Sequence, residues 1–447
     1  MKVSLIKYSD INSSMRLNGK YHLSKGNIYS KKLRSMPFEE LGNLTSKIFT
    51  AGRSKRVYTD KDHGYPYLSN TDVVKSSSFE TCNYNSKKYG YDESSFLKEG
   101  MIVTGRVGAI GQTSYITSEF EEFKAMGSDN IIRIVPNDIN ISGYIYSFLA
   151  SKYGNTLLWK LAAGGVQSYI SEEMLLDMPI PMLEKPKQQT IHNLIVEASY
   201  LRVEANKLLR SAQEIIMHNL AYKKEEKPLK IALSTLLNSH QKRFESQYFI
   251  SEGYQIKEHI KGKKYQLLKD VSEPIFRPGI FKRHYVEKGV EFFGGSDIVK
   301  AIPKSEKRLS IAKTKHLESL KIKEDWILVT CGGTIGFSVL VNRFMANKTA
   351  SQHILRVSAK NIKTGYLFAF MSSEIGLKAI QSFTYGSVIP QIEPHHLDLL
   401  PIPILEDSIM DKIHYMIMEY KEKISIAIEN ELLAIDLIEK EIESWQK

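Results

Sequence analysis

The sequence contains few of the residues and segments that mark secreted, zinc-binding or membrane-spanning proteins. Cys82 and Cys331 are the two cysteines in 447 residues, and they lie far apart without ligand spacing. This excludes a disulfide framework and a structural zinc site, so we expect two buried thiols. No apolar run approaches the roughly 20 residues that cross a bilayer, and the first residues lack the apolar core of a signal peptide. We therefore expect a cytoplasmic protein without a membrane partner.

Catalytic and metal-binding patterns are also missing. The sequence has no Asn/Asp-Pro-Pro-aromatic loop of an adenine methyltransferase, no phosphate-binding loop ending in lysine, and no carboxylate-and-lysine cluster of a nuclease. His395 and His396 beside Glu393 lack a third ligand at suitable spacing, so we expect a solvated turn there. We predict no catalytic residue, no metal site and no cofactor bound by this chain.

Positive charge is in moderate excess. The chain has 61 Lys and Arg against 50 Asp and Glu, a formal net charge of +11 and a sequence pI of about 9.2. This balance favours a polyanionic partner. The hydrophobic fraction of 42% and the charged fraction of 25% are ordinary for a globular protein of several domains.

Two long helices are predicted, each behind a Pro-Ile-Pro turn. They cover residues 185 to about 224 and residues 407–445. In the first, apolar or small residues recur in the strict four-three alternation of a coiled-coil seam, and the second has an apolar stripe of similar length that drifts more. We expect the helices to pack antiparallel and to act as a spacer about 60 Å long. The predicted interface residues are Leu194, Ala198, Leu201, Ala205, Leu208, Ala212 and Ile215 in the first helix and Ile417, Tyr420, Ile424, Ile428, Ile435 and Ile438 in the second.

The chain is a duplication. Residues 38–58 align without a gap with residues 265–285, and Ile-Phe, Gly, Lys-Arg and Tyr coincide in the two segments. Farther along, Ser128 matches Ser351 and Pro179 matches Pro401, as expected when a few loops differ in length. One ancestral module was therefore copied.

This repeat predicts the fold class and the domain order. We expect an α+β protein in which two similar β-rich domains are separated by two long helices that form an antiparallel coiled coil, with a pseudo-two-fold relation. The predicted parts are residues 1–165 (first module), 166–227 (linker and first long helix), 228–387 (second module) and 388–447 (linker and second long helix).

Each module contains a glycine-rich segment between two apolar runs, at residues 105–111 and 331–336. No helix is predicted directly after the glycines, so we expect tight hairpins with positive φ and not a nucleotide-phosphate loop. The next runs, residues 131–135 and 354–357, read as buried strands whose single arginine reaches outward. One helix then follows in each module, at residues 142–162 and 364–382.

This doubled order resembles the specificity subunit of Type I restriction-modification systems. The resemblance is carried by the two Pro-Ile-Pro turns, Gly-Gly-Val and Gly-Ser-Val before them, and Pro-Lys-Gln-Gln at residues 186–189. It implies that each module is a target-recognition domain for one half of a bipartite double-stranded DNA sequence. It further implies that the helices set the spacing and dock two methyltransferase subunits, which would hold S-adenosylmethionine, and that restriction or translocase subunits can join.

Basic and amide side chains in the modules are the candidate DNA contacts. Lys55 with Arg56 and Lys282 with Arg283 occupy equivalent repeat positions, as expected of sequence-independent phosphate contacts. Candidate base readers lie in segments that differ between the copies. They are Arg53, Arg106, Gln112, Arg277, Lys348 and Gln352.

Other interpretations remain open from the sequence. Each of these side chains can be an ordinary surface residue, and the basic pairs can lie in solvated turns. The whole protein can also be an assembly scaffold that binds protein alone, or a DNA methyltransferase with an unrecognised site.

Overall fold

The computed structural model describes residues 19–53, 55–89, 91–162, 168–224, 231–238, 244–386 and 390–445, together with Ile6, Tyr8 and Leu17. The chain forms two compact units, Met1–Val203 with Ile426–Lys447 and Glu204–Ser425. Each long helix contributes one half to each unit. The domain boundaries from the sequence treat each helix as a single segment, so they stay predictions.

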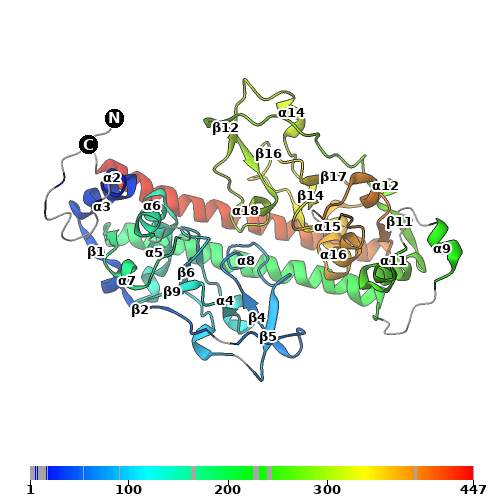
Figure 1. Ribbon diagram of the computed structural model, residues 1–447, viewed down its shortest axis with the longest axis horizontal. Helices are drawn as coiled ribbons and strands as arrows, with labels where there is room; N and C mark the ends of the chain where they lie inside the picture. The colour runs from blue at the N-terminus through cyan, green and yellow to red at the C-terminus, as the bar shows by residue number, and fades with distance from the viewer. Residues whose placement is uncertain are drawn as a thin grey trace. The chain divides into compact units, whose positions relative to one another are not determined.

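The first module consists of short strands and helices before the first long helix, α8 (Lys185–Leu220) (Figure 1). Its sheets have the orders β2-β9-β6-β7, β3-β5-β4-β8 and β1-β10. The elements are α2 (Gly19–His22), α3 (Lys25–Arg34), β1 (Phe38–Glu40), η1 (Leu41–Leu44), β2 (Thr45–Thr50), β3 (Tyr58–Thr59), β4 (Gly64–Leu68), β5 (Asn83–Ser86), η2 (Glu93–Ser95), β6 (Ile102–Gly105), β7 (Thr113–Tyr115), α4 (Ser118–Glu122), β8 (Met126–Gly127), β9 (Ile131–Pro136), η3 (Ile139–Ile141), α5 (Ser142–Ala150), α6 (Lys152–Leu161), α7 (Glu173–Leu176) and β10 (Pro179–Pro181).

The second module repeats this plan before the second long helix, α18 (Asp407–Ser444). Its sheets have the orders β15-β14-β17, β13-β12-β16 and β11-β18. The elements are α9 (Leu233–Asn238), α10 (Ser246–Ile250), α11 (Glu252–Lys261), β11 (Tyr265–Leu267), α12 (Leu268–Val271), β12 (Tyr285–Phe293), α13 (Gly295–Ile298), β13 (Arg308–Leu309), α14 (Leu317–Leu320), β14 (Ile327–Thr330), β15 (Ser338–Leu340), β16 (Thr349–Ala350), β17 (Ile354–Val357), α15 (Thr364–Ser372), α16 (Glu374–Gln381), α17 (Pro394–Leu397) and β18 (Pro401–Pro403).

The predicted α+β order of two similar modules and two long helices is confirmed. The single helix predicted after the last strand of each module is wrong, because each is two helices, α5 with α6 and α15 with α16. The break falls at Ser151 and Ser373, which are extended and cap the following helix with their hydroxyls. A serine hydroxyl that binds a nearby backbone N–H competes with helix continuation, and an apolar run does not reveal this.

The Pro-Ile-Pro turns are strands that close each module on its own beginning. β10 pairs antiparallel with β1 and places Phe38 opposite Pro181, and β18 pairs with β11 in the same register. The hydroxyl of Tyr144 donates to the Pro181 carbonyl, and that of Tyr366 donates to the Pro403 carbonyl at 2.7 Å. Each long helix therefore starts from a fixed point on its module.

A histidine on each long helix makes a second repeated tie. The Gly143 N–H donates to His192 Nδ1 at 3.2 Å, and the Gly365 N–H donates to His414 Nδ1 at the same distance. A ring nitrogen that accepts a hydrogen bond cannot carry a proton, so both contacts need neutral histidines. Burial is the largest cause that lowers the pKa of each ring.

The two long helices are antiparallel where the first unit contains both. Lys187 Nζ lies 2.9 Å from Glu441 Oε1, and Arg202 Nη2 lies 2.6 Å from Glu431 Oε2. The partner number falls as the α8 number rises, which is the antiparallel direction predicted from the sequence. The predicted two-fold relation between the modules stays a prediction.

Burial along the helices differs in part from the predicted seam. Ala198, Ala205 and Ala212 of α8 are buried, whereas Leu194, Leu201, Leu208 and Ile215 are half-buried. The buried positions follow a second four-three alternation, which contains the same alanines together with Arg202. Because arginine is charged, a search of the sequence for apolar residues does not find this alternation. In α18, Ile417, Tyr420, Ile424, Ile428 and Ile438 are buried and Ile435 is half-buried. Assignment of these residues to an interface stays a prediction.

A buried polar group interrupts the apolar frame in the first unit. The Glu431 carboxylate accepts hydrogen bonds from both Arg202 and the Tyr146 hydroxyl, and the Arg202 and Glu431 side chains are 12% and 8% exposed. The repeat places Phe368, Ile424 and Leu209 at the equivalent positions, and all three are buried. One repeat therefore has a polar group where the other has an apolar one.

Removal of Glu431 should strongly destabilise the chain. Glu431→Ala leaves the Arg202 charge and the Tyr146 hydroxyl buried without their acceptor, and we expect a loss of about 3–5 kcal/mol in the free energy of unfolding. Asp436→Ala is the matched control, since it removes an exposed carboxylate paired with Lys440 on the same helix and should cost about 0.5 kcal/mol or less. Equal losses in denaturant titrations of the two variants would contradict the account.

The free energy of unfolding should also decrease as the pH is lowered, because His192 and His414 must be neutral to accept their hydrogen bonds. Because their folded-state pKa lies below the ordinary value of about 6.5, their contribution is present above that pH and is lost as the pH falls toward the folded-state pKa. The double variant His192→Asn, His414→Asn keeps an acceptor that does not titrate. We expect Tm to drop less between pH 7.5 and 5.5 in this variant than in the wild type, with His218→Asn as a control for loss of an exposed histidine. Identical drops would rule the tie out as a pH-sensitive contact.

Candidate nucleic-acid interface

A short turn of the same geometry joins two strands in each module. In the first module it links β8 to β9, with the Ser128 N–H bonded to the Leu68 carbonyl and the Ile131 N–H bonded to the Ser128 carbonyl. In the second module the turn links β16 to β17, and Ser351 and Ile354 make the corresponding bonds at distances within 0.1 Å of the first set, 2.9 and 3.3 Å against 2.9 and 3.2 Å.

Buried arginines hold both turns from within. Arg133 donates to the carbonyls of Ile131 at 2.9 Å and Gly127 at 2.5 Å, and Arg356 donates to those of Ile354 at 2.6 Å and Ala350 at 2.5 Å. Both side chains are essentially inaccessible, with relative exposures of 0% and 2%. The expectation that these arginines reach outward is therefore wrong.

The two guanidinium groups lie in similar electrostatic environments, one in each module. Burial lowers the pKa of Arg133 and of Arg356 to about 10, so both stay charged at neutral pH. Phe49 lies 5.8 Å from the Arg133 guanidinium, and Phe276 lies 5.7 Å from that of Arg356. These phenylalanines are the aligned Phe positions of the Ile-Phe dipeptide, and this contact is a physical reason for their recurrence.

The turns present different side chains on this common backbone. We call residues 129–130 and 352–353 the tips; they are Asp129 and Asn130 in the first module and Gln352 and His353 in the second. The carbonyl of the second tip residue accepts an N–H from the glycine-rich segment, at 2.9 Å from Arg106 in one module and from Cys331 in the other. Each tip therefore lies against a glycine hairpin.

The glycine hairpins have the predicted backbone. Gly108, Gly111, Gly333 and Gly336 have φ between 79° and 89°, which confirms the expected positive φ. A side chain at Gly111 or Gly336 would collide with or press on α6 or α16, whereas space around Gly108 and Gly333 is open. Gly108 and Gly333 are exposed, whereas Gly111 and Gly336 are buried.

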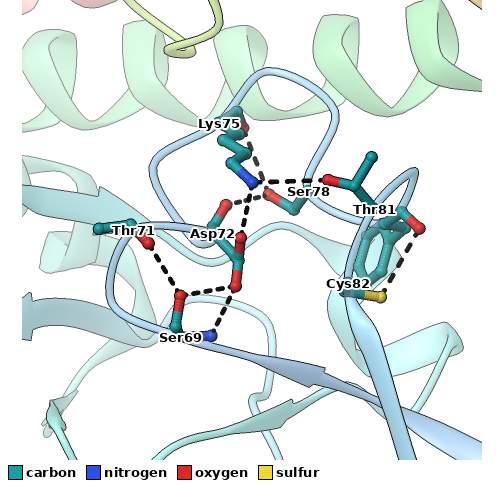
Figure 2. A network of polar contacts seen from close by, with 8 residues as sticks. Ser69, Thr71, Asp72, Lys75, Ser78, Thr81 and Cys82 are labelled. Carbon is teal, nitrogen blue, oxygen red and sulfur yellow. Dashed lines mark hydrogen bonds and ion pairs between the residues drawn. The ribbon is translucent and has the colours of Figure 1, made fainter. Parts of the chain in front are cut away.

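An aspartate network fixes the loop after β4 (Figure 2). The Asp72 carboxylate accepts from the Ser69 N–H at 2.9 Å and from Lys75 at 2.7 Å. Although burial opposes it, these bonds hold the pKa of Asp72 below its ordinary value. Asp297 makes the same contacts in the second module, with the Gly294 N–H at 2.9 Å and Lys300 at 2.8 Å.

In the first module, arginines predicted from the sequence gather at the tip. Arg56 Nη2 lies 3.0 Å from Asp129 Oδ1, and Arg53 Nε lies 3.5 Å from Asp129 Oδ2. Asp129 is 15% exposed, whereas the Arg53 side chain is 90% exposed. One carboxylate therefore partly neutralises two cations that solvent still reaches.

The second module brings three predicted residues together at its tip. Arg283 Nη2 donates to Gln352 Oε1 at 2.7 Å, which is the counterpart of the contact between Arg56 and Asp129. Arg277 Nε donates to the Gln352 carbonyl at 2.9 Å, and its guanidinium also pairs with Glu393. Burial raises the pKa of the Glu393 carboxylate, but the hydrogen bond from Arg277 opposes this, and the pKa lies below its ordinary value.

The other predicted contacts are distributed more widely. Lys55, Lys282 and Gln112 are exposed, and Arg106 is half-buried. Lys348 packs over the Phe344 ring at 3.5 Å and pairs with Glu291 at 3.3 Å, and burial is the largest cause that lowers its pKa. Which of these residues bind DNA stays a prediction.

Asp129, Asn130 and His353 were not predicted from the sequence as members of the candidate interface. The signal was present, since the aligned serines Ser128 and Ser351 place the next two residues of each copy at equivalent positions. Short polar turns look alike in sequence, and nothing local shows that a buried arginine holds this one in a fixed conformation.

Both cysteines of the chain are free. Burial raises the pKa of the Cys331 thiol and of the half-buried Cys82 thiol to about 11. No group of three or more His, Cys, Asp or Glu side chains among the described residues is arranged to hold a metal ion. The solvated turn expected at His395 and His396 is instead the short helix α17, in which His396 is buried.

The described helices do not include one with the length and apolar character needed to cross a membrane.

Comparison with known proteins gives one family and several distant structures. Residues 257–436 match the Type I restriction modification DNA specificity domain. No curated protein matches the chain. The S subunit of the Type-I restriction-modification system from M. genitalium is 12% identical, with 91% of this chain and 94% of that chain covered and a TM-score of 0.32.

Two further solved structures have similar statistics. The HsdS subunit from Thermoanaerobacter tengcongensis is 11% identical, covering 90% of this chain and 95% of that one, with a TM-score of 0.28. A chain from a structure of type I R-M system assembly is 11% identical, covering 91% and 97%, with a TM-score of 0.27. All three solved structures are distant from this chain, and the family match covers residues 257–436.

Proposed function

We propose that the two modules of this chain each read one half of a bipartite double-stranded DNA target, because residues 257–436 match the Type I restriction modification DNA specificity domain. In this proposal the chain is the specificity subunit of such a system. It supplies recognition, while catalysis belongs to other subunits.

The observation that carries the proposal is the repetition of the module's internal ties. The family match, residues 257–436, includes most of the second module, and the first module has the same strand register at Pro181 as the second has at Pro403. The buried arginines Arg133 and Arg356 also make the same kind of carbonyl contacts. Two copies of one DNA specificity domain in one chain favour a target with two parts.

Charge supports DNA as the ligand. The net charge of +11 favours a polyanion, and exposed or half-exposed basic side chains flank both tips. Lys55 with Arg56 and Lys282 with Arg283 suit phosphate contacts, which position a protein on the duplex without reading its sequence. The tips carry side chains that can hydrogen-bond to base edges.

The long helices suit the role of a spacer and a docking surface. α8 has 36 residues and α18 has 38, so each is about 55 Å long at 1.5 Å per residue. We propose that they fix the distance between the two half-sites and bind two methyltransferase subunits, with S-adenosylmethionine held by those partners. A restriction or translocase subunit would complete the system, and the cytoplasm is the expected location.

Methylation mapping in the source cells tests the proposed function. We expect deletion of the gene for this chain to abolish methylation at one bipartite motif genome-wide, and re-expression of the wild-type chain to restore it. The reason is that the methyltransferase partners would lose their means of locating the target. An unchanged methylation map after deletion would contradict the proposal and would favour a scaffold that binds protein alone.

A further inference from the structure

The two tips combine a common backbone with different side chains. We infer that Asp129 with Asn130 and Gln352 with His353 are base-reading positions of the two modules, so that these four residues determine part of the sequence each module recognises. This inference rests on the proposed function, and it names residues within each module.

The first step is the rigidity of the tip backbone. In the first module the buried Arg133 guanidinium holds the carbonyls on both sides of the tip, and the Arg106 N–H holds the carbonyl of Asn130. The Ser128 N–H in addition bonds to the end of β4. A base reader must be held in place to discriminate, because a mobile side chain accommodates any base edge.

The second step is that the same rigid backbone recurs where the side chains differ. Arg356, Cys331 and Ser351 make the corresponding contacts around Gln352 and His353. The arginine, serine and phenylalanine that hold or contact this turn are the same in the two copies, whereas the tip residues differ. A copied module that changes its target keeps its scaffold and changes its readers.

The third step is the chemistry of the tip side chains. A carboxylate such as that of Asp129 accepts hydrogen bonds and therefore fits a donating base edge, such as the cytosine amino group in the major groove. The Gln352 amide both accepts and donates, which fits adenine. Asn130 and His353 add a second polar group at each tip. The two tips therefore favour different bases.

The arginine beside each tip acts as a positioning residue. Arg56 contacts one oxygen of Asp129, and Arg283 contacts the side-chain oxygen of Gln352. Each contact fixes the orientation of the tip side chain. The alternative role for Asp129 is neutralisation of Arg53 and Arg56, which predicts an effect on affinity for every DNA sequence and none on sequence preference.

Exchange of the tip separates these roles. In cells that lack the chain, we would express the variant Asp129→Gln, Asn130→His, which gives the first module the tip of the second. We expect the methylated motif to change at one or two positions of one half-site, with the other half-site and the spacing intact. Methylation of the original motif should fall on the order of tenfold, since a base contact contributes this much discrimination.

A conservative variant covers failure of the exchange to fold. Asp129→Asn keeps the shape of the side chain, and the backbone contacts that hold the tip do not involve its carboxylate. For purified Asp129→Asn, we expect a changed preference at a single base pair of one half-site in competition binding with duplexes that differ at each position. Glu122→Gln, at an exposed position of the same module, removes the same charge and should leave preference unchanged.

The outcomes distinguish this inference from the proposed function. If the wild-type chain restores no motif in the deleted cells, the proposed function fails and the inference fails with it. If the wild type restores a bipartite motif but the tip variants recognise the same motif, the inference alone is overturned. A uniform gain in affinity of Asp129→Asn for all duplexes would also overturn it, because the carboxylate would then act by neutralisation.

Discussion

The turn in each module depends on a charged side chain buried under main-chain carbonyls. Transfer of a guanidinium from water into the interior costs several kcal/mol, and charge-assisted hydrogen bonds to two or more carbonyls offset much of it. Arg133 and Arg356 therefore impose one geometry on the chain between Gly127 and Ile131 and between Ala350 and Ile354. The tip, the glycine hairpin beside it and the neighbouring arginine all take their positions from that geometry.

Contacts that fix the backbone recur in the two modules, whereas one buried polar group between side chains is present in the first unit alone. Tyrosine, histidine and proline contacts recur at Tyr144 and Tyr366 and at His192 and His414. The polar group at Arg202 and Glu431 does not recur. Within the first unit, the buried pair of Arg202 and Glu431 between α8 and α18 favours one register of the two helices, because a shifted alignment would separate the two charges.

Much of the architecture could be predicted from the sequence because repetition and periodicity are long-range signals. The predicted start of α8 is correct, and its end at Leu220 precedes the predicted 224 because the next residue, Ala221, has a left-handed φ of 47°. The glycine hairpins were predictable since few residues other than glycine tolerate such angles. These features follow from local chemistry that does not depend on tertiary packing.

The features that the sequence did not reveal all depend on tertiary contacts. A lone arginine in an apolar strand usually reaches solvent, and only packing around Arg133 makes burial favourable. Arg202 lies in the buried helical frame because Glu431 and Tyr146 are in place, whereas the sequence favoured a frame of apolar residues. The tip at Asp129 is a two-residue turn, and its fixed conformation depends on the buried Arg133 side chain, which is far from obvious in the sequence.

The central claim is that each module reads one half-site independently of the other. A chain in which residues 265–403 are replaced by residues 38–181 tests it directly, because both junctions fall in strands that pair in the same register in the two modules. Methylation mapping of cells that make this chain in place of the natural one is the measurement. The account predicts a motif whose two halves both carry the half-site of the first module, and a motif whose second half keeps its original sequence would contradict it.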